Sequence, residues 1–209
     1  MPTAKARAKK IKLLLFDVDG VMTDGSIWLF PAPAGAEQST QAAAAARADA
    51  GGYAIASNTM VEAKGFNAHD GTAISLARLG GLKTGVITKR ISETVALRAR
   101  DLRLDHVYQG ISDKLATFHE ILKRERIGEM EAAYVGDDII DLPIMRRCGL
   151  AVSVPNAREE VKDEAHFITD HPGGHGAIRD IVEYILRAQG KLEAVIEKYL
   201  EARGPIKKE

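Results

Sequence analysis

The sequence predicts an α/β fold: a three-layer α/β/α sandwich with a mostly parallel, Rossmann-like sheet. Two observations predict it. Short apolar runs, such as residues 13–16 and 132–136, alternate with longer segments whose apolar residues recur at helical spacing. The run at 13–16 carries no polar residue, which is typical of a strand buried on both faces. Strands that alternate with helices form parallel βαβ units with right-handed crossovers.

Length and composition favour one globular domain that spans residues 1–209. Hydrophobic residues make up 45% of the chain and charged residues 28%, which is ordinary for a protein with a packed core. Lys and Arg number 29, as do Asp and Glu, so the formal net charge is zero. We therefore expect neither a nucleic-acid partner nor a membrane-surface partner.

The cysteine content and the N-terminus suit a cytoplasmic protein. The single cysteine, Cys148, cannot form an intramolecular disulfide. The basic start of the chain is followed by only four apolar residues, too few for a signal peptide, and no stretch is long enough to cross a bilayer. We interpret the basic start as a solvated tail.

After the first strand, the chain predicts a protruding β-hairpin with a long insertion. Residues 27–30 and 61–67 are its two arms. Residues 31–58 contain prolines, glycines and an alanine run without apolar periodicity, which predicts a flexible insertion. Trp28, Phe30 and Phe66 are interpreted as packing residues.

The remaining elements alternate as the fold class requires. We expect strands at 83–88, 106–108, 132–136, 150–154 and 166–169. We expect helices at 74–79, from Ser92, from Ser112 or Asp113, and at 142–147, 157–162, 177–189 and 191–202. The last of these belongs to a C-terminal helical tail at 190–209.

The first strand delivers two acids, Asp17 and Asp19, to the sheet edge where ligands of parallel sheets bind. Two residues apart in a strand, they share a face. Neighbouring carboxylates repel unless one is protonated or a cation lies between them, and oxygen ligands suit Mg²⁺. The alternative is that they merely end a strand in a turn, although an acid directly after four apolar residues would be partly buried and costly without a partner.

Three more strand ends carry polar residues at the same edge. Thr88 ends one predicted strand, Lys114 begins the helix after another, and Asp137 follows Gly136 directly, with Asp138 and Asp141 close behind. Each has an ordinary alternative. Thr88 can simply approach a helix, Lys114 can be a solvated surface residue, and acids at a helix start favour the helix dipole. Together and in this order they form a highly specific set.

This set resembles the haloacid dehalogenase superfamily of phosphatases. Within it, the chain resembles the 3-deoxy-D-manno-octulosonate 8-phosphate phosphatase subfamily, from Ile11 to about Leu192 except in the insertion. The motifs specific to that subfamily lie at 66–71, 108–110, 173–179 and 188–192. The resemblance implies a capless domain that hydrolyses a 2-keto sugar acid phosphate and assembles as a homotetramer.

The resemblance also implies catalytic and metal-binding roles. Asp17 would be the nucleophile and Asp19 the general acid and base. Mg²⁺ would be held by Asp17, the backbone carbonyl of Asp19, and Asp137. Thr88 and Lys114 would hold the phosphoryl oxygens. Asp138 and Asp141 would orient Lys114 and the metal's water ligands.

The substrate contacts implied by the resemblance are Asp19, Asn67, Ala68, His69, Asp70, Gly71, Arg90, Arg98 and Lys114. The chain departs from the subfamily pattern at four positions. His69, Ser75 and His175 stand where arginine is usual, and Lys89 replaces a glycine. Because arginine binds carboxylates bidentately, these changes bear on recognition of an acidic sugar. The alternatives are a phosphatase for another small phosphorylated metabolite and a non-catalytic regulatory module.

Overall fold

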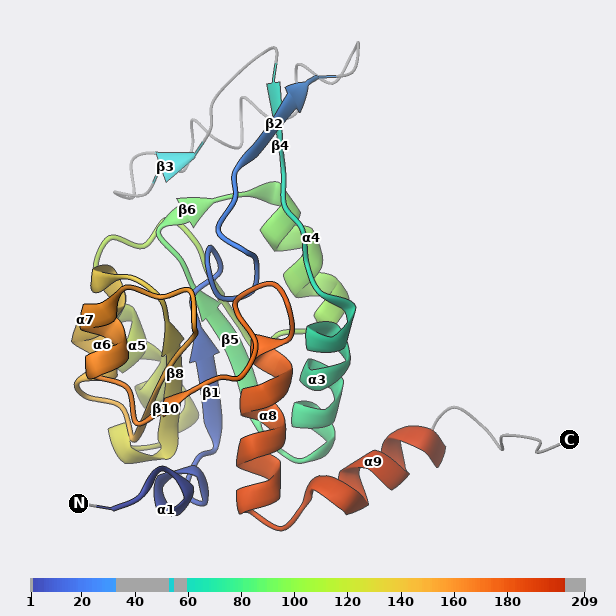
Figure 1. The fold of residues 1–209 in the computed structure, drawn as a ribbon, viewed down its shortest axis with the longest axis vertical. Helices are drawn as coiled ribbons and strands as arrows, with labels where there is room; N and C mark the ends of the chain where they lie inside the picture. Colours follow the sequence, from blue (N-terminus) through green and yellow to red (C-terminus); the bar gives the residue numbers. More distant parts are fainter. Residues whose placement is uncertain (1, 33–52, 55–59, 202–209) are drawn as a thin grey trace, which may run out of the picture.

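Strand β1 (Leu13–Phe16) lies inside the main sheet, between β5 (Lys83–Ile87) and β8 (Ala132–Gly136). The structure is a computed structural model that describes residues 2–32, 53–54 and 60–201. Within these residues the sheet has six strands in the order β10-β9-β8-β1-β5-β7, and all neighbours pair in parallel. The predicted parallel sheet is confirmed (Figure 1).

The other strands of the sheet are β7 (His106–Tyr108), β9 (Leu150–Ser153) and β10 (Phe167–Ile168). The helices in the described part of the chain are α1 (Ala4–Ala8), α3 (Ala68–Leu79), α4 (Glu93–Leu102), α5 (Lys114–Glu125), α6 (Leu142–Met145), α7 (Glu159–Asp163), α8 (Ala177–Ala188) and α9 (Leu192–Glu201). Short 3₁₀ turns occur at η1 (Glu129–Glu131) and η2 (Ile139–Asp141). None of the helices described is long and apolar enough to cross a membrane.

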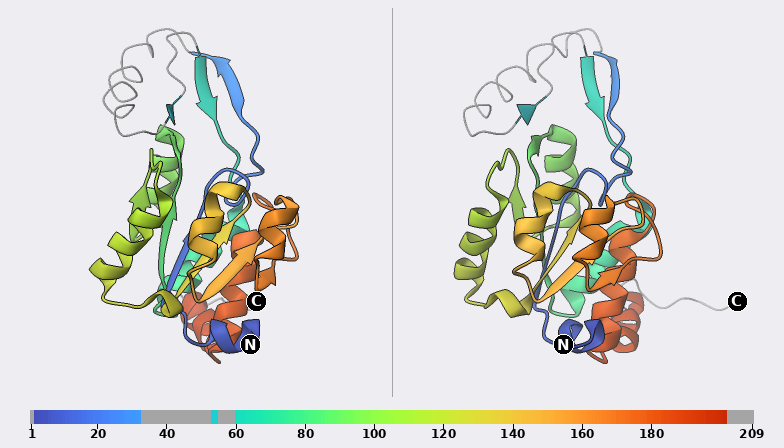
Figure 2. Two further views of the ribbon diagram at one scale, coloured as in Figure 1. Left: turned by 90° about the vertical axis from the view of Figure 1, so that its left-hand side faces the viewer. Right: turned by 60° about the vertical axis from the view of Figure 1, so that its left-hand side comes forward.

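Helices cover both faces of the sheet, as Figures 1 and 2 show. Helices α3 and α8 lie side by side on one face, and α5 lies on the other with α6 beside it. Helix α8 turns an apolar stripe inward through Ile178, Ile181, Val182 and Ile185, all fully buried. The central strands β1, β8 and β9 are therefore buried along their whole length, whereas the edge strands β7 and β10 have exposed residues.

A two-stranded hairpin rises beyond the carboxyl ends of the sheet strands (Figure 2). Its arms β2 (Trp28–Pro31) and β4 (Met60–Ala63) pair antiparallel. The predicted second arm ended at residue 67, whereas β4 ends at Ala63. Trp28 and Phe30 are about half exposed in the described part of the chain, whereas the third side chain expected to pack, Phe66, is partly buried against the core.

Most of the predicted insertion, at residues 33–52 and 55–59, lies outside the described residues. Between these stretches, β3 (Tyr53–Ala54) pairs in parallel with β6 (Arg90–Ile91), which follows β5. The sequence offered no apolar alternation that would have indicated this pairing, because each strand is only two residues long.

The N-terminal segment is not a solvated tail, and that prediction is wrong. Residues 4–8 form α1, whose first turn is capped by the Thr3 hydroxyl. Ala8 is fully buried, and Arg7 donates a 2.8 Å hydrogen bond to the carbonyl of Gly149. Alternating alanines among the basic residues make this helix, because alanine has the highest helix propensity.

Helix α3 begins earlier than predicted. The sequence indicated 74–79, whereas the helix starts at Ala68 with Asn67 as its N-cap. Gly71, inside the first turns, concealed the start, because glycine lowers helix propensity. Its position is explained by packing: a Cβ there would lie 2.6 Å from Nη2 of Arg98.

Candidate active site

Asp17 is the first residue beyond β1, and its carboxylate is buried. The strand ladder continues through it, because its backbone N–H donates to the carbonyl of Val135 at 3.0 Å. Its Oδ1 accepts a 2.7 Å hydrogen bond from the backbone of Val18, and its Oδ2 lies 2.9 Å from the ammonium of Lys114. Burial and the charge of Asp141 raise the pKa of Asp17 to about 6.

Lys114, the first residue of α5, is buried between two acids. Its Nζ lies 2.9 Å from Asp17 and 2.7 Å from Oδ1 of Asp141, and Tyr134 donates to that same Oδ1 at 2.7 Å. Burial by itself would lower the pKa of Lys114, but the charges of Asp17 and Asp141 raise it. The ammonium is therefore fixed in its charged form beside the Asp17 carboxylate.

Asp137 follows β8 and completes an acidic cluster with Asp17 and Asp141. Each of the three offers an oxygen that lies within 4.8 Å of the other two. Burial and the charges of its two neighbours raise the pKa of Asp137 to about 8. Among the described residues its buried Oδ1 has no hydrogen-bond partner. An unpartnered carboxylate oxygen beside a second buried carboxylate is what an oxygen-ligated cation requires.

Asp141 differs from the other two members of this cluster. It is fully buried, and both of its oxygens already accept hydrogen bonds: Oδ1 from Lys114 and Tyr134, and Oδ2 from the backbone of Asp137 at 3.1 Å. Asp17 and Asp137 are thus the carboxylates with capacity for a cation, while Asp141 orients Lys114. Asp138 does not share that task. It is exposed, and its side chain caps η2 through the backbone N–H of Ile139.

A pocket of about 180 Å³ opens over this cluster. Thr88, at the end of β5, is buried there, and its backbone N–H donates to the carbonyl of Tyr108 at 2.9 Å. The residues that line the pocket are Asp17, Asp19, Gly25, Thr88, Lys89, Arg90, Asp137, Asp138 and Ile140. The structure therefore brings together the strand-end residues that the sequence singled out.

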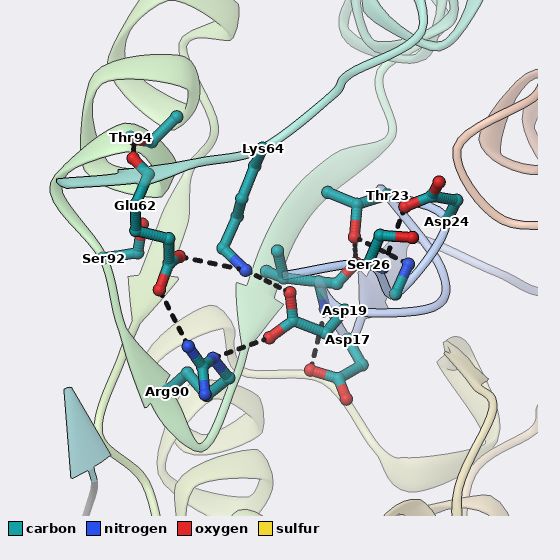
Figure 3. A network of polar contacts seen from close by, with 12 residues as sticks. Asp17, Asp19, Thr23, Asp24, Ser26, Glu62, Lys64, Arg90, Ser92 and Thr94 are labelled. Carbon is teal, nitrogen blue, oxygen red and sulfur yellow. Dashed lines mark hydrogen bonds and ion pairs between the residues drawn. The ribbon is translucent and has the colours of Figure 1, made fainter. Parts of the chain in front are cut away.

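Asp19 is held by Lys64, which sequence reasoning missed, and by Arg90, which it had assigned to the substrate. Its Oδ1 forms an ion pair with Lys64, and its Oδ2 lies 3.3 Å from Nε of Arg90 (Figure 3). Glu62 lies 3.1 Å from Nζ of Lys64 and accepts a 2.7 Å hydrogen bond from Arg90. Charged residues at alternate positions, Glu62 and Lys64, were the available signal, but a hairpin arm predicted to pack gave no reason to place them here.

The predicted substrate residues of segment 67–71 do not line this pocket. Asn67 and Ala68 border a second pocket of about 300 Å³, together with His175. His69 is exposed. The backbone carbonyl of Asn67 accepts from Arg98 at 3.5 Å, and Arg98 lies over the Phe66 ring at 5.8 Å. These contacts fasten the base of the hairpin to α4.

Asp70 is buried and serves another helix. Its Oδ1 accepts a 2.9 Å hydrogen bond from the backbone N–H of Arg179, in the first turn of α8. Burial raises its pKa, while hydrogen bonds from the backbone of Arg179 and Gly176 oppose the shift. The structure thus assigns Asp70 to the junction of α3 and α8, away from the Asp17 pocket.

The glycine-rich segment at 173–176 packs directly on the loop after β1. The carboxamide of Asn156 links the two: it donates to the carbonyl of Gly20 at 2.8 Å and accepts from the backbone of Gly173 at 2.7 Å. Gly20 has φ +84°, and a Cβ on it would overlap Oδ2 of Asp137. Only glycine allows this close approach between the β1 loop and Asp137.

Comparisons with known proteins agree with this geometry. A family described as haloacid dehalogenase-like hydrolase matches residues 87–181. The 3-deoxy-D-manno-octulosonate 8-phosphate phosphatase KdsC of Yersinia pestis is 36% identical over 187 residues, which are 90% of this chain and 86% of the relative.

Solved structures show the same similarity. A probable yrbi family phosphatase from Pseudomonas syringae pv. phaseolica 1448a has a TM-score of 0.78 and 38% identity, and covers 94% of this chain and 97% of its own. The 3-deoxy-D-manno-octulosonate 8-phosphate phosphatase of Moraxella catarrhalis, in complex with magnesium ion, phosphate ion and a KDO molecule, has a TM-score of 0.77 and 32% identity, with coverage of 94% and 97%.

Proposed function

Because this chain belongs to the haloacid dehalogenase-like hydrolase family, we propose that it is a phosphomonoesterase that hydrolyses 3-deoxy-D-manno-octulosonate 8-phosphate. One observation carries the proposal: the buried Asp17 carboxylate lies 2.9 Å from the Lys114 ammonium and beside an Asp137 oxygen that has no hydrogen-bond partner in the described part of the chain. This arrangement supplies a nucleophile, a fixed positive charge and a cation site at one point.

The reaction proceeds in two steps. An oxygen of Asp17 attacks phosphorus and the ester P–O bond breaks, while Asp19 gives a proton to the departing alcohol oxygen. Water then attacks the phosphorus of the aspartyl-phosphate, and Asp19 takes a proton from that water. The Asp17–phosphorus bond breaks, inorganic phosphate leaves, and both carboxyl groups return to their starting state.

The acidic cluster fits Mg²⁺. Asp17, Asp137 and the backbone carbonyl of Asp19 would hold the ion, which would offset the negative charge of the phosphoryl group. The raised pKa values of Asp17 and Asp137, about 6 and about 8, support the fit, because burial and neighbouring carboxylates disfavour the ionised forms and a bound cation would offset both effects. The Moraxella catarrhalis relative was solved with a magnesium ion.

Thr88 and Lys114 bind the phosphoryl oxygens in this proposal. Thr88 lines the pocket from β5, and Lys114 approaches Asp17 from α5. Asp141 holds Lys114 in place through its 2.7 Å contact. Asp138, exposed at the pocket wall, would orient water at its mouth.

Substrate recognition involves both pockets. Arg90 lines the Asp17 pocket, and Asn67, Ala68 and His175 border the second. His69, Asp70, Gly71 and Arg98 support this second region in the proposal, Asp70 and Gly71 by holding the backbone of α3. His69 and His175 present imidazoles where the subfamily has guanidinium groups, which favours testing other acidic sugar phosphates alongside the proposed substrate.

We further propose that the working enzyme is a homotetramer. The exposed apolar arm of the hairpin, Trp28 to Phe30, suits burial against other copies of the chain. Within the described residues no cap domain covers the site, and assembly through the hairpins would enclose it and so exclude water from it.

The proposal is tested by turnover of a panel of phosphorylated sugars, with released phosphate as the readout. The proposed substrate, other 2-keto sugar acid phosphates and neutral sugar phosphates are compared at equal concentration with Mg²⁺. The highest kcat/KM is expected for 3-deoxy-D-manno-octulosonate 8-phosphate. A clear preference for a neutral sugar phosphate contradicts the substrate, and absence of turnover across the panel contradicts the activity.

A further inference from the structure

Lys64 is a charged residue that is buried near the Asp17 pocket without lining it. Its side chain has no exposed surface, although it sits just beyond β4 at the base of an exposed hairpin. A buried ammonium is costly unless it is paired. Here it is paired twice, with Asp19 and with Glu62 at 3.1 Å.

The four charged groups form a closed ring in which cations and anions alternate. Lys64 contacts Asp19 and Glu62, and Arg90 contacts the same two acids, at 3.3 Å from Asp19 and 2.7 Å from Glu62 (Figure 3). The two positive and two negative charges balance. Both oxygens of Asp19 are held, one by each cation, so the side chain is fixed from two sides.

The two cations differ in what can reach them. Arg90 and Asp19 line the Asp17 pocket, whereas Lys64 and Glu62 do not. Lys64 does not line the pocket and its side chain is wholly buried, so a substrate in the pocket can reach Arg90 but not Lys64. Lys64 is therefore placed to act on Asp19 and has no surface with which to touch a substrate.

Glu62 anchors this support to the body of the domain. Burial would raise its pKa, but hydrogen bonds and charge from Arg90 and Lys64 outweigh burial and lower it, so the residue is ionised. Its backbone carbonyl also accepts from the Thr94 hydroxyl in α4 at 3.4 Å. Through these contacts Glu62 connects the base of the hairpin to α4 and to the charged residues around Asp19.

From this geometry we propose that Lys64, oriented by Glu62, is a positioning residue that holds the Asp19 carboxyl group in place for proton transfer to the leaving oxygen. The inference rests on the proposed function of Asp19. Under this proposal the hairpin supports the active site of its own chain through Lys64 and Glu62, in addition to any role in assembly.

Leaving-group dependence distinguishes this role from a general structural one. Lys64→Met keeps the stem of the side chain and removes the charge. Turnover is compared for the sugar phosphate, whose leaving alkoxide needs a proton, and for p-nitrophenyl phosphate, whose leaving group does not. We expect kcat/KM, which reports formation of the aspartyl-phosphate and not its hydrolysis, to fall by about tenfold to a hundredfold for the sugar phosphate. For p-nitrophenyl phosphate, kcat/KM should change by less than about threefold.

Two further variants keep the test decisive. Glu62→Gln should show the same selective loss to a smaller extent, and it decides the question if Lys64→Met does not fold. Lys83→Met is the matched control, because Lys83 is half exposed at the opposite end of β5 and pairs only with Asp105 among the described acids in reach. This control should retain wild-type rates with both substrates.

A double-mutant cycle with Asp19→Asn distinguishes the positioning role of Lys64 from the acid role of Asp19. If Lys64 acts through Asp19, adding Lys64→Met to Asp19→Asn should cause no further loss. Losses that multiply in the double variant, or equal losses of kcat/KM with both substrates, overturn the positioning role. If Asp19→Asn alone retains wild-type turnover of the sugar phosphate, the acid role of Asp19 fails, which is a different result.

Discussion

The ammonium nitrogen of Lys114 lies 2.9 Å from Oδ2 of Asp17. The two residues come from different elements, one beginning α5 and one following β1, and both are almost wholly buried. The contact keeps the carboxylate oriented toward the pocket and offsets part of its charge. An attacking carboxylate has to be ionised, and this neighbour favours the ionised form.

Replacing Asp17 by Asn should abolish turnover and leave the fold intact. The amide has nearly the same shape but cannot attack phosphorus, so activity should fall below about a hundredth of the wild-type rate. Released phosphate and a thermal melt are the measurements, with exposed Glu159→Gln as the control. Turnover near the wild-type rate in Asp17→Asn would remove this residue from the nucleophile's role.

Removal of divalent metal should stop turnover, and Mg²⁺ should restore it. The prediction follows from the unpartnered Oδ1 of Asp137 beside Asp17. Calorimetric titration of Mg²⁺ into the chelated protein should show binding that Asp137→Asn weakens strongly. Full activity in excess chelator would contradict a metal-dependent reaction.

The metal-free protein should lose stability as the pH rises. Asp137 has a pKa of about 8 in the fold against an ordinary 3.8, and Asp17 is shifted in the same direction. Between those values the folded state binds more protons than the unfolded state, so the free energy of unfolding falls with rising pH. Thermal melts in chelator from about pH 5 to pH 8 should therefore shift downward.

Two comparisons check this pH effect. Mg²⁺ should raise the melting temperature most at the alkaline end of this range, where Asp17 is ionised and Asp137 is closest to being ionised. Asp137→Asn should flatten the pH dependence in chelator. A melting temperature that rises over this range in the chelated wild-type protein would show that other groups dominate.

Gly20→Ala should impair metal binding and activity. A Cβ at this position would overlap Oδ2 of Asp137, and φ of +84° is itself unfavourable for alanine. Gly81→Ala is the matched control, because Gly81 has φ +78° but open space around its Cβ. Both variants should lose about 1–2 kcal/mol of stability from backbone strain. Only Gly20→Ala should lose Mg²⁺ affinity by titration. Equal Mg²⁺ affinities in the two variants would show that the overlap with Asp137 does not affect metal binding.

Light scattering should give a mass near four times 22.6 kDa. The motive is the exposed apolar arm, in which Ile27, Trp28, Leu29 and Phe30 are each about half exposed. Phe30→Asp should dissociate the assembly, because it places a charge in an apolar contact. A fully active monomer of the wild-type chain would contradict the tetramer.

Much of this arrangement could be predicted from the sequence, because it depends on local patterns. The apolar run before Asp17 and the one before Asp137 marked strands, and parallel strands bring their carboxyl ends to one edge. Thr88 and Lys114 were found by the same rule. Their convergence is a property of the fold class and needs no knowledge of individual contacts.

The missed features depend on pairs distant in the sequence. Glu62 and Lys64 looked like ordinary charges on a hairpin, since their partners Asp19 and Arg90 belong to other elements. The motif around Asp70 suggested a substrate contact and gave no sign of its hydrogen bond from the backbone of Arg179, 109 positions away. The spacing of apolar residues in a sequence does not indicate which distant residue will pair with a buried charge.

The place of β1 in the sheet has a consequence for the chain as it is being made. This strand leaves the ribosome before both of its partner strands, Lys83–Ile87 and Ala132–Gly136, which are synthesised much later. Until those strands are made, four consecutive apolar residues remain exposed and unpaired, and exposed apolar surface of this kind promotes aggregation of nascent chains. The lysines and arginine around α1, at positions 5, 7, 9, 10 and 12, directly precede this strand and can act as charged gatekeepers during that interval.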